Sequence, residues 1–147
     1  MEFKEIIMVV LKSCLFFLLL VLIPCQSSLA RSKKPVSPEN RIAIVDVNQN
    51  SGSWDSSDVI LTYQYDTLSG SIRLNVRGKA KQKYDELKVW VLFVDAEGMV
   101  LDKKLVYGSG YRTGQRSRGF SAEKTYTLPP KTTSMAFRSL LTPYLGP

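Results

Sequence analysis

The chain has 147 residues and a formal net charge of +7 at pH 7, with 44% hydrophobic and 22% charged residues. This balance is typical of a globular protein and excludes a chain that is disordered throughout. Histidine is absent, and both cysteines, Cys14 and Cys25, lie near the N-terminus. The rest of the chain therefore excludes Ser-His-Asp and Cys-His catalytic centres, disulfides and zinc sites of the Cys/His kind.

Residues 1–30 are typical of a signal peptide or membrane anchor. A charge-free apolar run over residues 13–25 follows two lysines, and Ser28 and Ala30 place small residues where a signal peptidase reads the chain. This pattern predicts an exported protein, periplasmic or extracellular, that is cleaved after Ala30.

Two alternatives to cleavage stay open. An apolar leader helix over residues 6–25 could remain as a membrane anchor, at the cost of burying one lysine. Residues 22–25 also resemble a bacterial lipobox, which predicts lipidation at Cys25, although Pro24 departs from the small residue expected before the cysteine.

Residues 31–41 combine prolines, serines and cations and predict a basic linker ahead of a domain over residues 42–147. The two lysines and two glutamates of the leader cancel, so the remainder keeps a charge of +7. Such a charge favours an anionic polymer or lipid surface as partner, and export makes nucleic acid the least expected one. The alternative is a solvated basic surface without a specific partner.

The domain opens with a β-branched strand over residues 42–47, and residues 48–57, rich in Asn, Ser and Gly, predict a loop. Residues 59–66 alternate, with Val59, Leu61, Tyr63 and Tyr65 on one face. Residues 71–77 alternate again after a turn at residues 69–70, so the two runs predict a hairpin.

Residues 79–86 are polar and predict a connection. Residues 87–94 are apolar on both faces, which predicts a central strand covered on both sides, or one lying between a sheet and a lid. A turn at residues 95–98 leads to a return strand over residues 99–106. The last two strands are expected at residues 120–128 and 134–141, separated by Pro129 and Pro130.

Helical periodicity is absent after residue 30, and seven short strands at spacings near ten residues predict an all-β fold. The expected architecture is a single small antiparallel β-sandwich, immunoglobulin-like, after the N-terminal apolar leader helix. A small open barrel is the alternative.

Two segments of the domain resemble a known family. Residues 72–78, a strand that ends in Gly78, and residues 88–101, a hydrophobic strand followed by Asp95, Gly98 and a short return strand, are similar to the FxLYD-type domains of exported bacterial proteins. The motif that names the family is absent, because residues 91–95 read Val-Leu-Phe-Val-Asp. The resemblance implies fold class and export, and it brings no catalytic residues.

Two groups of cations are candidate contacts for an anionic ligand. The loop over residues 108–119 carries four glycines around Tyr111, Arg112, Arg116 and Arg118, and arginine forks bind phosphate and carboxylate. The second group predicts a basic stripe across one sheet edge, where lysines also serve to discourage edge-to-edge aggregation. Its members are Arg73, Arg77, Lys79, Lys81 and Lys83.

Carboxylates occur in pairs at predicted turns, such as Asp55 with Asp58, Asp85 with Glu86 and Asp95 with Glu97. Such pairs serve glycosidases and calcium sites, but Asp and Glu are also common at turns for local reasons. The sequence favours a non-enzymatic exported β-sandwich, without metal or cofactor, that binds an envelope protein or an anionic envelope component. The alternatives are a carboxylate-dependent hydrolase of envelope glycans and a structural subunit that assembles by strand addition.

Overall fold

A computed structural model of the chain describes residues 34–45, 50–110 and 118–144. The predicted leader, with its cleavage site at Ala30 and its lipidation site at Cys25, lies outside the described residues. Within the described residues, no helix is long and apolar enough to cross a membrane.

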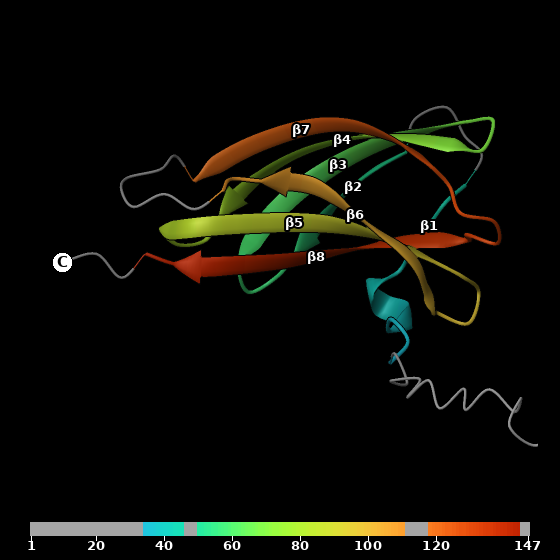
Figure 1. The fold of residues 1–147 in the computed structure, drawn as a ribbon, viewed down its shortest axis with the longest axis horizontal. Helices are drawn as coiled ribbons and strands as arrows, with labels where there is room; N and C mark the ends of the chain where they lie inside the picture. The colour runs from blue at the N-terminus through green and yellow to red at the C-terminus, as the bar shows by residue number, and fades with distance from the viewer. Residues whose placement is uncertain (1–33, 46–49, 111–117, 145–147) are drawn as a thin grey trace, which may run out of the picture. The chain divides into compact units, whose positions relative to one another are not determined.

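The described residues form eight strands in two four-stranded sheets (Figure 1), in which every neighbouring pair is antiparallel. Sheet A has the order β1-β8-β5-β6, and sheet B has the order β2-β3-β4-β7. The prediction of an all-β fold is therefore confirmed. The strands are β1 (Ile42–Ala43), β2 (Asn50–Asp55), β3 (Val59–Leu68), β4 (Ser71–Ala80), β5 (Tyr84–Val94), β6 (Val100–Gly108), β7 (Gly119–Thr127) and β8 (Ser134–Pro143).

The order of the strands in sheet B differs from that of an immunoglobulin constant domain. Here β2, β3 and β4 are consecutive neighbours, and β7 follows beside β4. In the immunoglobulin domain the second strand pairs with the fifth. The similarity is therefore to the two-sheet architecture and not to the connectivity.

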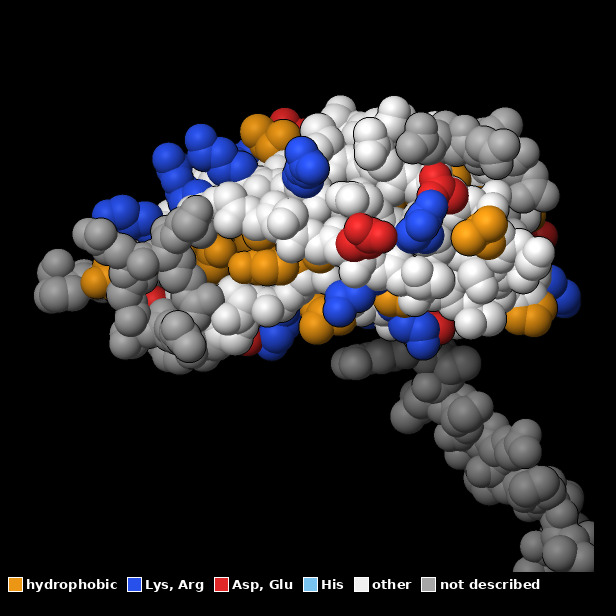
Figure 2. Space-filling view, turned by 90° about the horizontal axis from the view of Figure 1, so that it is seen from above, with side chains coloured by type: hydrophobic (Ala, Val, Ile, Leu, Met, Phe, Trp, Pro, Cys, Tyr) orange, Lys and Arg blue, Asp and Glu red, His pale blue; other side chains and the backbone are white. Residues whose placement is uncertain are grey.

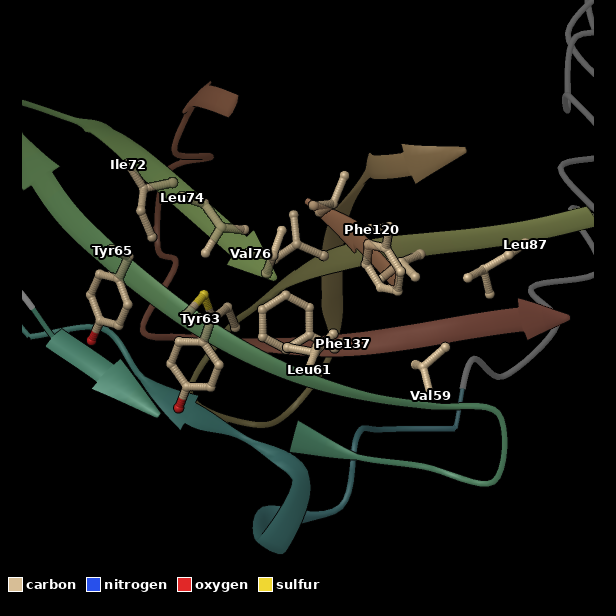
Figure 3. Close-up of a cluster of buried hydrophobic side chains, with 14 of the residues drawn as sticks. Val59, Leu61, Tyr63, Tyr65, Ile72, Leu74, Val76, Leu87, Phe120 and Phe137 are labelled. Carbon is tan, nitrogen blue, oxygen red and sulfur yellow. The ribbon is translucent and has the colours of Figure 1, made fainter. Parts of the chain in front are cut away.

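A core shared by both sheets lies between them, and it forms by the two-residue alternation that the sequence predicts (Figure 3). Alternate residues of β3 and β4 point inward, and on β5 the inward positions are fully buried. Burial of one such aliphatic side chain contributes about 1.5–3 kcal/mol. The buried side chains of these three strands include Val59, Leu61, Tyr63, Tyr65, Ile72, Leu74, Val76, Leu87, Val89, Val91 and Phe93.

Tyr65 joins the two sheets with its hydroxyl group as well as its ring. The hydroxyl donates a hydrogen bond of 2.8 Å to the carbonyl of Ala43 in sheet A and accepts one of 2.9 Å from the Asn50 amide in sheet B. A buried phenol needs such partners because an unpaired polar group in the core is costly.

The prediction of a loop over residues 48–57 is wrong, because Asn50–Asp55 forms strand β2 at the edge of sheet B. Gly52 and Trp54 point toward the core, whereas Ser51 and Ser53 are exposed. Gly52 leaves space that the Tyr63 ring fills, since a Cβ atom at Gly52 would overlap the Tyr63 hydroxyl. The sequence conceals this strand because one inward position is a glycine without a side chain and the next is a large tryptophan. The usual alternation of medium-sized apolar residues is therefore missing.

Strands β4 and β5 are both longer than predicted. Strand β4 continues through Ala80 and β5 begins at Tyr84, so the polar connection shrinks to residues 81–83. Tyr84 is among the fully buried side chains of the core. Three lysines in this segment masked the continuation of the alternation.

The end of the predicted linker is attached to the domain. Residues 38–40 form a short 3-10 helix, η1, and the backbone amide of Val36 donates to the carbonyl of Gly98 at 2.8 Å. The Arg41 guanidinium donates to the carbonyls of Val36, Ala96 and Glu97 at 2.8–3.3 Å. Gly98 has φ +92°, and a Cβ atom there would overlap the guanidinium of Arg41.

Strand β5 lies between β8 and β6, as expected of a central strand, and its outer face is less completely buried than predicted. Leu87, Val89, Val91 and Phe93 face the core, whereas Trp90 on the other face is only partly buried. In the part of the chain that the structure describes, no strand or helix is laid over this outer face of sheet A (Figure 1).

Gly78 is required by the ring of Phe120 on the neighbouring strand β7. The two residues are directly opposite, and a Cβ atom at Gly78 would overlap the Phe120 ring. We expect Gly78→Ala to lower the free energy of unfolding by about 1–3 kcal/mol, since both neighbours of β4 restrict relief of the overlap. Urea denaturation measures this cost.

The matched control is the same substitution in a Phe120→Ala background, where the ring is gone. There we expect Gly78→Ala to cost less than in the wild type, with a coupling of at least about 0.5 kcal/mol. Equal costs in both backgrounds would show that the ring does not dictate the glycine.

Candidate anionic-ligand site at one end of the sandwich

Two basic segments that are far apart in the sequence meet at one end of the sandwich. The backbone amide of Ala80 donates to the carbonyl of Arg118 at 2.8 Å, and Nη1 of Arg118 donates to the carbonyl of Lys81 at 3.4 Å. These contacts place the β4–β5 turn beside the end of the β6–β7 loop. Figure 2 shows Lys and Arg side chains gathered toward this end.

Strand β4 extends this cluster along the outer face of sheet B. Arg77 and Lys79 are two residues apart and point to the same face, and Lys79 is directly opposite Gly119, the neighbour of Arg118. Lys83 is exposed in the same turn as Lys81. We call this group of cations the basic end: Arg77, Lys79, Lys81, Lys83 and Arg118.

The predicted basic stripe is thus divided, and it does not follow a sheet edge. Strand β4 lies between β3 and β7, so edge protection does not explain its cations. Arg73 lies further along β4 and is ion-paired with Asp66 at 2.5 Å, a contact that raises the pKa of Arg73. Lys81 is ion-paired with Asp55 at 2.6 Å.

The loop that the sequence singles out is described only at its two ends. Tyr111, Arg112 and Arg116 lie outside the described residues. At its start, the amide of Ser109 donates to the carbonyl of Leu87 at 3.0 Å, and the Ser109 hydroxyl accepts from the Leu87 amide at 2.9 Å. The loop therefore leaves from the end of the edge strand β6, beside the first residues of β5, and returns at Arg118 beside the β4–β5 turn.

A polar depression of about 540 Å³ lies on the outer face of sheet B next to the basic end. Arg77 belongs both to the basic end and to the wall of this depression. The sequence does not reveal it because Ser51 and Ser53 lie on β2, where the composition predicts a loop. The lining side chains include Ser51, Ser53, Thr62, Gln64, Asn75 and Arg77.

The carboxylates proposed for hydrolysis are separated. Asp55 and Asp85 belong to the end of the sandwich that carries the basic end, whereas Asp95 lies in the β5–β6 turn at the other end. Asp95 accepts a hydrogen bond of 2.7 Å from the Met99 amide, which is a local turn contact. Asp85 is buried, and its Oδ1 atom has no hydrogen-bond partner among the described residues.

Metal binding has no candidate in the described ranges, because no three His, Cys, Asp or Glu side chains gather there in a way that could hold an ion. Comparison with known proteins gives no match to a family model, a curated protein or a solved structure. The resemblance to FxLYD-type domains therefore stays a prediction.

The seam between β6 and β7 closes the sandwich next to the candidate site. The rings of Tyr107 and Phe120 stack across it with centroids 4.5 Å apart. The Tyr126 hydroxyl donates to the carbonyl of Leu105 at 2.8 Å, and its ring packs edge-on against Phe93. Burial raises the pKa of Tyr126 to about 12.

This pKa predicts a contribution to alkaline stability. The neutral phenol is favoured in the folded state, so the contribution is complete below the ordinary pKa of about 10 and is lost as the pH rises toward 12. We expect Tyr126→Phe to lower the free energy of unfolding near pH 7 by about 1 kcal/mol through the lost hydrogen bond. Between pH 10 and 12 its stability should fall less steeply than that of the wild type.

Urea denaturation over this pH range measures both effects. An unchanged slope in Tyr126→Phe would show that ionisation of this phenol is not linked to folding.

Proposed function

We propose that this chain is the non-enzymatic binding module of an exported protein and that its basic end contacts an anionic envelope polymer. The observation that carries the proposal is the meeting of Arg118 with Lys81, because it joins cations from two distant segments into one surface. Arg77 and Lys79 lie on strand β4, and hydrogen bonds join Arg118 to the adjoining turn, so little order has to be gained on binding.

The charges of the basic end are available to a ligand. Within the described ranges Arg77, Lys79 and Lys83 form no ion pair, and only Lys81 is partly neutralised, by Asp55. Clustered cations concentrate a polyanion near the surface and speed its association, an effect that falls with ionic strength.

The test uses the whole chain and immobilised inorganic polyphosphate as the probe. We expect the triple variant Lys79→Gln, Lys81→Gln, Arg118→Gln to bind several-fold more weakly at low salt. Each cation lost should reduce the slope of log affinity against log salt by an amount on the order of 0.7, the value for single-stranded nucleic acid.

The matched control removes the same charge from the outer face of sheet A, with Lys88→Gln, Lys103→Gln and Arg138→Gln. We expect this control to retain most of the affinity. Equal losses in both triple variants would mean that net charge and not the basic end governs binding, and the absence of binding by the wild type would end the proposal.

A second candidate function is assembly by strand addition, and the edge of sheet A favours it. Strand β8 runs from Ser134 to Pro143, but β1 pairs only with Ser134 and Met135. Beyond these two residues the outer edge of β8 has no strand partner in the described part of the chain. Open backbone groups on an edge accept an added strand.

Sedimentation velocity over a hundredfold range of protein concentration tests self-assembly through this edge. We expect the weight-average sedimentation coefficient to rise with concentration if a second copy adds its strand. A constant monomer value would exclude assembly of identical chains.

A further inference from the structure

The outer face of sheet A is apolar where a solvated sheet face would be polar. Trp90 of β5 lies directly opposite Leu105 of β6 and Arg138 of β8, so the three side chains form one row across the sheet. Leu140 of β8 and Lys103 of β6 are in the adjacent rows on either side. We call this surface the Trp90 face: Trp90, Leu92, Leu105, Leu140, Lys103 and Arg138.

Two leucines on the Trp90 face are well exposed: Leu105 keeps 47% of its surface accessible and Leu140 keeps 53%. They neighbour Trp90 directly or diagonally, so the exposed apolar surface is continuous. On the outer face of sheet B the strand centres carry hydroxyls, amides and charges, and the exposed aliphatic side chains of β3, Ile60 at 48% and Leu68 at 59%, are separated at opposite ends of that strand. Contiguous apolar surface of this kind marks an interaction site, whereas a single exposed side chain does not.

Cations are interleaved with these apolar side chains. Nζ of Lys103 lies 3.8 Å from the centroid of the Trp90 ring, and Arg138 is beside the same ring on the next strand. The carboxylate of Glu86 on this face is ion-paired with Lys88 at 2.7 Å. The face is therefore apolar and positive together.

We propose that the Trp90 face docks on an anionic lipid bilayer. Leucine side chains enter the boundary between head groups and acyl chains, while the long stems of Lys and Arg lie along the apolar surface and place their charges at the phosphates. Tryptophan favours the same boundary because its ring is apolar and its N–H is polar.

A second copy of the chain is a poorer occupant of the Trp90 face. A two-fold interface through it would bring Lys103 and Arg138 close to the same residues of the other copy, within chains of net charge +7. A bilayer with anionic head groups supplies the opposite charge and accepts a flat sheet face without a matching shape. An acidic protein surface is the remaining occupant, and the experiment below separates it from lipid.

Docking of the Trp90 face is independent of the function proposed for the basic end. The two surfaces belong to different sheets, with the Trp90 face on β5, β6 and β8 and the row of Arg77 and Lys79 on β4. A domain docked through sheet A would leave the outer face of sheet B, with its polar depression, open to a polymer.

Fluorescence quenching by lipids brominated in their acyl chains shows which face contacts the bilayer. The chain has two tryptophans, Trp54 in sheet B and Trp90 in sheet A. In the whole chain carrying Trp54→Phe, all tryptophan emission comes from Trp90. On vesicles of phosphatidylcholine and phosphatidylglycerol we expect brominated lipid to quench this emission, and in Trp90→Phe we expect the emission of Trp54 to stay unquenched.

This comparison holds even if the leader inserts, because quenching reports the position of each ring and not the total binding. In the Trp54→Phe background, we expect Leu105→Ser with Leu140→Ser to abolish the quenching of Trp90, and Lys103→Gln with Arg138→Gln to weaken it. The matched control is Ile60→Ser, which removes an equally exposed aliphatic side chain from the opposite sheet and should leave quenching unchanged.

Folding of every variant is checked by far-ultraviolet circular dichroism and by urea denaturation, neither of which depends on the function proposed for the basic end. Unquenched Trp90 on anionic vesicles would overturn the proposal and leave an acidic protein as the occupant. Equal quenching on vesicles of phosphatidylcholine alone would overturn the requirement for anionic lipid. Quenching that survives loss of both leucines would overturn the assignment of the face.

Discussion

The structure depends on one constraint, which is that alternate side chains of six long strands must meet in a single core between two sheets. Strands β3, β4 and β5 obey it most strictly, with Leu74 and Val89 buried completely from opposite sheets. Because the side-chain period is two, a shift of one residue in any of these strands would expose its whole buried set. This requirement fixes the register, and the register in turn decides which cations share a face.

The basic end is a consequence of register and could not be found from the sequence alone. Alternation predicts that Arg77 and Lys79 point away from the core, because Val76 must point inward. It does not predict that β7 pairs with β4, which is what brings Arg118 to Lys81. Strand pairing between distant segments is set by tertiary packing, and spacing along one chain carries no record of it.

The strands that the sequence hides are those whose inward positions do not look apolar. In β2 the inward pair is Gly52 and Trp54, and the glycine is there because the ring of Tyr63 occupies the space of its side chain. Composition therefore predicts a loop where packing demands a strand. The same arrangement recurs at Gly78, where the ring of Phe120 fills the space of the missing side chain. In the sequence a glycine suggests a poorly packed strand position, although in the structure this position is filled.

Strand β5 shows the opposite error, because its sequence predicts more burial than the described fold provides. Its apolar residues on both faces predict burial on both sides, yet Trp90 is only partly covered, with Lys103 over its ring. Burial in the core explains why Val89 and Val91 are apolar. It does not explain why the residue between them on the outer face is a tryptophan. Together with the exposed Leu105 and Leu140 this tryptophan forms the Trp90 face, and the neighbouring cations Lys103 and Arg138 give that face a positive charge, which favours an anionic partner.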